Sequence, residues 1–148
     1  MDKKNDEVLK EMNKFLKGIH MGGSTFKDYV ERTESKELKD ALVEIIETFK
    51  RHEEAITHRI EKLGGDASDS LGLIGTMVEV FQKIKLLSAN NDCEILDNAK
   101  EAMKMGIKNA NKFIDEHKDL EHSLKKEIKG VVKDYDNSLR KLESVSID

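Results

Sequence analysis

The chain has 148 residues, a formal net charge of −4 at pH 7, and neither Pro nor Trp. This length suits one domain over residues 1–148, and no run approaches the ~20 apolar residues that cross a bilayer. The single cysteine, Cys93, excludes an internal disulfide framework, and the first residues lack the apolar stretch of a signal peptide. Near-balanced charge argues against a nucleic-acid partner, because such domains usually present a basic face. We therefore expect neither a membrane nor a nucleic acid as a partner.

Apolar residues at alternating steps of three and four predict long amphipathic helices. Because Pro is absent and β-branched runs are rare, helix is the default interpretation along the chain. The first two helices are predicted over residues 5–33 and 35–63. Ser35 is the expected N-cap of the second helix, and the Gly64–Gly65 pair is its expected stop.

Three further helices are predicted over residues 71–88, 92–117 and 119–145, with Asp119 as the N-cap of the last. Short loops inside each pair of long helices make two antiparallel hairpins. The ~18 helical residues of the middle segment rise ~27 Å, so the third long helix can start at the end opposite the glycine stop. The predicted fold class is all-α: a four-helix bundle with one long crossover that is itself helical.

The two predicted hairpins align with each other. An offset of 84 residues pairs Gly22 with Gly106, and an offset of 82 pairs Phe49 with Val131. Any two amphipathic helices align to some degree, so duplication and chance both stay open. Related pairs of hairpins are a common way to build a bundle that hosts a site between them.

The segments KGIHMGGSTFKDYV (17–30) and LVEIIETFKRHEEAITHRIEKLGG (42–65) resemble the first two helices of ferritin-like proteins, including rubrerythrins. Over about residues 10–144, the chain more closely resembles a group of uncharacterised bacterial ferritin-like domains of unknown function. The resemblance implies a ferritin-like four-helix bundle and a bacterial, cytoplasmic protein.

Metal-carrying ferritin-like proteins use a Glu from one helix of each hairpin and a Glu-x-x-His from the next, around two irons. The six positions that correspond to these ligands here are, in chain order, Ile19, Phe49, His52, Met103, Val131 and Asp134. Four of them carry side chains that cannot bind iron, and burial of each contributes roughly 1.5–3 kcal/mol. The resemblance thus implies a bundle whose di-iron site has become core, with no cofactor, no catalytic residue and no enzymatic activity.

His52 lies on the apolar face of its predicted helix and permits two interpretations. The first is a neutral histidine at the core or its rim, hydrogen-bonded to Tyr135 or Tyr29. The second is a residual ligand of a single metal or haem, for which Asp134 and His20 are the other nearby candidates. The sequence leaves both open.

Gly22, Gly23 and Gly106 fall inside predicted helices. A glycine in a helix costs about 1 kcal/mol relative to Ala, so a local feature should favour it. One such feature is close packing of a neighbouring helix. The other is a ligand-sized gap between Gly22 and Gly106, which would suit a carrier of a small apolar molecule.

Two further functions follow from the sequence. The first is a non-catalytic ferritin-like bundle that acts through protein–protein contacts, as a homodimer or with another protein. Its expected contact surface is the crossover, because this segment has more apolar residues than one buried helix face needs. The extra apolar residues are Leu71, Val78, Val80 and Leu86. The second is a metal-binding redox or metal-storage protein with a degenerate site around His52.

Overall fold

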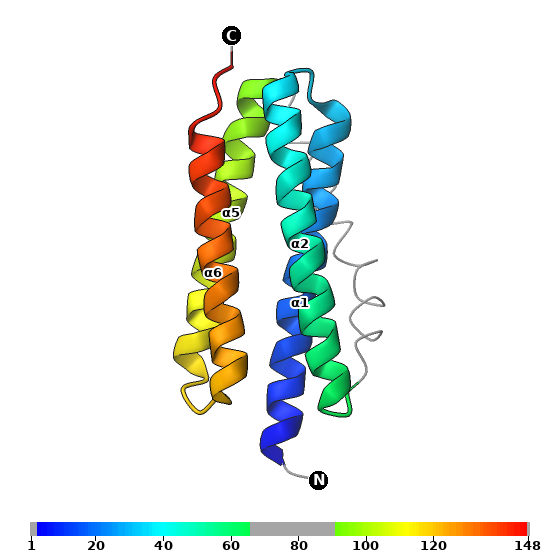
Figure 1. The fold of residues 1–148 in the computed structure, drawn as a ribbon, viewed down its shortest axis with the longest axis vertical. Coiled ribbons are helices and arrows are strands. Elements are labelled where there is room, and N and C mark those ends of the chain that lie inside the picture. Colours follow the sequence, from blue (N-terminus) through cyan, green and yellow to red (C-terminus); the bar gives the residue numbers. More distant parts are fainter. Residues whose placement is uncertain (1–2, 66–90, 148) are drawn as a thin grey trace.

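The computed structural model of the chain describes residues 3–65 and 91–147. Across these residues the four helices are, in chain order, α1 (Lys3–Arg32), α2 (Lys36–Lys62), α5 (Asp92–Glu116) and α6 (His122–Glu143). Figure 1 shows α1 antiparallel to α2 and α5 antiparallel to α6, so the chain forms two hairpins side by side. The all-α, four-helix-bundle prediction is confirmed. None of the described helices is long and apolar enough to cross a bilayer.

The predicted crossover helix, residues 71–88, lies outside the described residues, and so do its apolar residues Leu71, Val78, Val80 and Leu86. The helices before and after this segment, α2 and α5, are both described. Helix α5 begins at the end of the bundle opposite the end of α2, as predicted (Figure 1).

The start of α5 is tied to the turn between α1 and α2. The two carboxylate oxygens of Asp92 accept hydrogen bonds from the backbone N–H groups of Glu34 and Ser35, at 3.0 and 2.9 Å. Since α2 also begins at this turn, α2 and α5 start together and run parallel. The bundle therefore packs α1 against α2 and α5, and α6 against α5 and α2.

Local chemistry sets the ends of α2. The hydroxyl oxygen of Ser35 accepts a hydrogen bond from Leu38 N, so the predicted N-cap is confirmed. At the other end Gly64 has a φ of +84°, a left-handed conformation that favours glycine. Gly64 N and Gly65 N donate to the carbonyls of Glu61 and Ile60, both at 2.9 Å, which is a Schellman motif.

The predicted start of the last helix is wrong. Helix α6 begins at His122 and not at 119, and its N-cap position is Glu121, whose side chain makes no capping hydrogen bond. Asp119 is therefore not the N-cap. The cause is the connecting turn, in which Leu120 N donates to the carbonyl of His117 at 3.1 Å and so delays the helix.

One hydrophobic core runs along the bundle axis, formed by the faces that the periodicity predicted. Its largest fully buried side chains are Phe26, Met12, Leu16, Ile19, Leu38, Leu42, Ile56, Ile60, Ile95, Met103, Ile128 and Leu142. All four described helices contribute, so the core joins the two hairpins. Any site between the hairpins must compete with this packing for space.

Candidate functional site

Four of the six positions that correspond to iron ligands are part of the core. Ile19, Phe49, Met103 and Val131 are all buried among apolar neighbours. Their side chains carry no atom that can bind a hard metal ion. At these positions the centre of the bundle is filled with apolar side chains.

The other two positions, His52 and Asp134, meet across the contact between α2 and α6. Nε2 of His52 lies 3.0 Å from Oδ2 of Asp134, with side chains 11% and 34% exposed. The two atoms are close, but their geometry is not that of a well-aligned hydrogen bond. The structure thus brings together the two positions that kept a polar side chain.

The expected hydrogen bond from His52 to Tyr135 or Tyr29 is wrong, because Asp134 is the polar group at Nε2. Tyr135 contacts the imidazole through its ring, with centroids 5.9 Å apart and the planes at 89°. Tyr135 follows Asp134 by one residue and so points about 100° away around α6, into the core. Tyr29 packs against the ring of Phe26 instead.

Burial controls the protonation of His52 and Tyr135. Removal from water lowers the pKa of the His52 imidazole, and the negative charge of Asp134 opposes that effect without cancelling it. Burial also raises the pKa of the Tyr135 hydroxyl, to which the charge of Asp134 adds. Both side chains are therefore neutral at pH 7, while Asp134 reaches solvent at its edge.

His20 does not join them. Its Nδ1 lies 3.5 Å from Oε2 of Glu53, across the contact between α1 and α2. Over residues 3–65 and 91–147, no group of three or more His, Cys, Asp or Glu side chains is placed to hold a metal ion. A di-iron centre needs several anionic oxygen ligands, and one imidazole with one carboxylate do not fit that need.

Aromatic rings occupy the space beside two of the three helix glycines for which close packing or a ligand-sized gap was predicted. A Cβ on Gly22 would lie 2.8 Å from Cζ of Phe49, and one on Gly106 would lie 3.1 Å from the ring of Tyr135. At Gly23 the nearest atom is Cβ of Phe49 at 4.0 Å. The rings of Phe49 and Tyr135 also touch each other, with centroids 5.4 Å apart. At Gly22 and Gly106 the glycines therefore admit rings of the protein itself.

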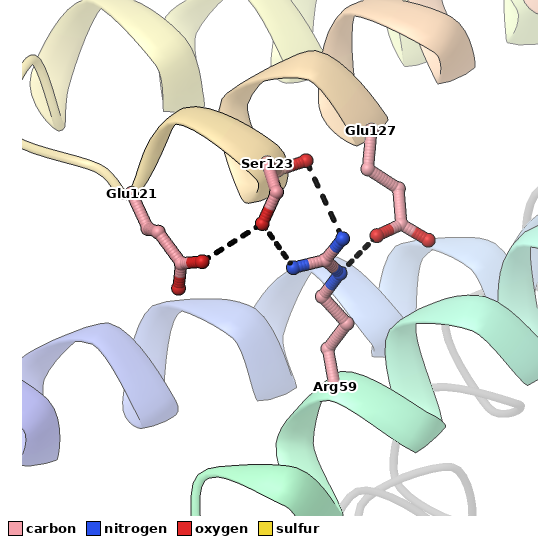
Figure 2. A network of polar contacts seen from close by, with 4 residues as sticks. All are labelled: Arg59, Glu121, Ser123 and Glu127. Atoms are coloured by element: carbon pink, nitrogen blue, oxygen red, sulfur yellow. Dashed lines mark hydrogen bonds and ion pairs between the residues drawn. The ribbon is translucent and has the colours of Figure 1, made fainter.

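A second polar cluster joins the hairpins near the end of α2 (Figure 2). The Arg59 guanidinium is paired with Glu127, and its Nη1 donates to the hydroxyl of Ser123 at 2.9 Å. That hydroxyl donates in turn to Glu121 at 2.9 Å. Sequence reasoning missed this cluster. Arg59 lies more than 60 residues from Ser123 and Glu127, so no short-range pattern links it to them.

Comparison with known proteins agrees with this description of the fold. The chain is similar to a two-domain protein from Anabaena variabilis ATCC 29413 that contains DJ-1/ThiJ/PfpI-like and ferritin-like domains, with 21% identity and a TM-score of 0.75. The match covers 95% of this chain and 36% of that one, so this chain spans about a third of its length. The bundle thus has a ferritin-like fold.

The family is defined more closely by the sequence. Residues 7–116 match the family described as "Domain of unknown function (DUF2383)", and the chain belongs to that family. The matched region runs from the first turns of α1 to the end of α5. No curated protein matches the chain.

Proposed function

We propose that this ferritin-like bundle is non-catalytic and acts through contacts with other protein chains, as a homodimer or with a different protein. One observation carries the proposal: apolar side chains fill four of the positions that hold metal ligands in the metal-carrying bundles, and all four are buried. Removing such side chains for a metal would cost the packing of the core. The outer helix faces are then left for interaction.

The chemistry of the centre supports the same proposal. Phe49 and Tyr135 fill the space beside Gly22 and Gly106, so the rings take up the volume that a small ligand would use. A buried carboxylate without its metal would cost several kcal/mol, whereas a buried Phe or Val stabilises the bundle. The centre is thus suited to holding its helices together and not to exchanging ligands.

Metal analysis tests the non-catalytic part of the proposal. The full chain is purified without added iron, and its transition metals are measured by mass spectrometry beside His52→Ala. We expect far less than one metal ion per chain in both proteins. A stoichiometric metal in the natural chain that is lost in His52→Ala would overturn the proposal.

Sedimentation equilibrium of the full chain tests the contact part. We propose the crossover residues Leu71 and Val80 as part of the surface, so Val80→Glu should shift a homodimer toward monomer. Val43→Glu, the same change at an exposed position of α2, is the control and should leave the mass unchanged. A chain that stays monomeric, and that captures no specific partner by cross-linking in its own cells, would contradict this part.

A second function has one observation in its favour. The approach of His52 Nε2 and Asp134 Oδ2 to 3.0 Å supplies two of the donors that a metal-binding redox or storage protein would need. Protein sites for zinc and similar ions use at least three protein ligands. The same metal analysis decides between the two functions, because only the second predicts a bound ion that depends on His52.

A further inference from the structure

The contact between α2 and α6 carries three pairs of basic and acidic side chains, each joining one hairpin to the other. We name this set the α2–α6 ladder. Its pairs are Glu44 with Lys141, His52 with Asp134, and Arg59 with Glu127.

The ladder is regular. Along α2 its members are eight and seven residues apart, and along α6 they are seven apart. Seven residues are about two turns of helix, so all three pairs lie on one face of each helix. Because α2 and α6 are antiparallel, the pairs follow one another along the contact as evenly spaced rungs.

The ladder also has an approximate twofold symmetry. Arg59 and Lys141 occupy equivalent positions at the offset of 82 residues that aligns α2 with α6, and so do His52 and Asp134. Each helix therefore places a basic residue near its end against an acidic residue of its partner. The central rung is where the two equivalent positions face each other. An interface of this kind is self-complementary.

Sliding one helix along the other destroys the arrangement. A shift of α6 by one turn places Arg59 opposite Ser123 or Val131 instead of Glu127. A shift by seven residues in one direction places Glu44 opposite Asp134, which brings like charges together. A hydrophobic contact alone tolerates such shifts better, because its attraction has little direction.

We infer that the α2–α6 ladder sets the register in which the two hairpins dock, and that it ties them together at the place where metal-carrying bundles use an ion. The central rung consists of the two family positions that kept polar side chains. The rung at Arg59 is strengthened by Ser123, and the rung at Glu44 is exposed and individually weak. The inference holds whether or not the outer faces bind a partner.

Charge exchange tests the inference in the full chain, with a chelator present throughout. Glu44→Lys and Lys141→Glu should each raise the unfolding equilibrium constant about two- to fivefold, and the double variant should return it to within about twofold of the natural chain. Arg59→Glu and Glu127→Arg, whose side chains are less exposed, should show the same pattern with about tenfold effects.

The matched control is the exposed pair of Glu101 and Lys104, which lies within α5 and joins no hairpins. Its exchange should change the unfolding constant less than twofold, singly or together. Additive single effects at the Glu44 rung, with no recovery in the double variant, would overturn the inference. That rung is exposed on both sides, so its variants test the ladder even if an Arg59 variant does not fold.

Discussion

The two hairpins solve the same packing problem in slightly different ways. In the first, the ring of Phe49 lies over Gly22, and in the second the ring of Tyr135 lies over Gly106. The glycines are equivalent at an offset of 84 residues, but the aromatic residues are not, since Phe49 aligns with Val131, one turn before Tyr135. A glycine on one helix therefore leaves room for an aromatic ring from the next helix, but it does not determine which turn of that helix carries the ring.

The two hairpins also differ in how closely the ring approaches the glycine and in which polar groups reach the core. The ring lies closer to the glycine in the first hairpin, at 2.8 Å from the position of an added Gly22 Cβ compared with 3.1 Å at Gly106. The second hairpin brings a hydroxyl into the core and, one residue earlier, the carboxylate that faces His52. The polar groups at the centre are thus Asp134 and Tyr135 of the second hairpin and His52 of the first.

The largest expected effect is at Phe49. Its ring contacts those of Phe26 and Tyr135, so Phe49→Ala leaves a cavity at the meeting point of both hairpins and should cost about 3–5 kcal/mol. Val131→Ala, at the equivalent position, deletes fewer atoms and should cost about half as much. Urea denaturation of both variants measures the two losses. Equal losses would show that Phe49 has no special role.

The glycines should respond in the order of their distances. Gly22→Ala places a methyl group against a ring held on two sides, and we expect a loss of about 1–3 kcal/mol despite the better helix propensity of Ala. Gly106→Ala needs a shift of only a few tenths of an ångström, so its loss should be smaller. Thermal unfolding followed by circular dichroism tests this order, and a more harmful change at Gly106 would reverse the comparison.

Acid should lower the stability of the bundle through His52, because folding buries the imidazole that becomes charged. Because the pKa of His52 is lowered on folding, the unfolded chain binds the proton first, and stability falls as the pH drops below about 6.5 toward the folded pKa. Each unit of lowering corresponds to about 1.4 kcal/mol lost once the pH is below both values. Denaturation from pH 8 to 5 should show this loss in the natural chain and less of it in His52→Gln. His20→Gln, whose partner is Glu53 of the same hairpin, serves as the control.

The smallest effects should be stabilising. At Gly18 in α1 and Gly130 in α6, no atom lies within 4 Å of the position that an added Cβ would take, so one open glycine lies in each hairpin. Changing either to Ala should add about 1 kcal/mol, because Ala loses less backbone entropy in a helix. A rise in the midpoint of thermal unfolding checks this. A loss of stability at either position would mean that free space beside the glycine is not the only property that separates Gly18 and Gly130 from Gly22.

Much of the fold could be predicted because it depends on local patterns. The apolar spacing gave each of the four described helices within a few residues, and Ser35 and Gly64 marked the ends of α2 as expected. The N-cap at Asp119 failed because a short turn and a helix start compete over the same few residues. Small differences in free energy decide between them.

Only part of the candidate site could likewise be predicted from local patterns. Periodicity alone placed Ile19, Phe49, Met103 and Val131 on inward faces, where the structure buries them. It could not show that His52 faces Asp134 and that Tyr135 offers only its ring. That outcome depends on the rotation and register of α6 against α2.

The sequence by itself therefore determined which segments are helical, where most of them end and which faces are apolar, because turns, caps and helical period act over a few residues. Only the tertiary structure decided which side chains meet between hairpins: His52 with Asp134, Arg59 with Glu127, and the rings of Phe49 and Tyr135 with each other. The physical reason is that a side-chain pairing across 68 or more residues depends on the relative position of two whole helices, to which every contact along them contributes.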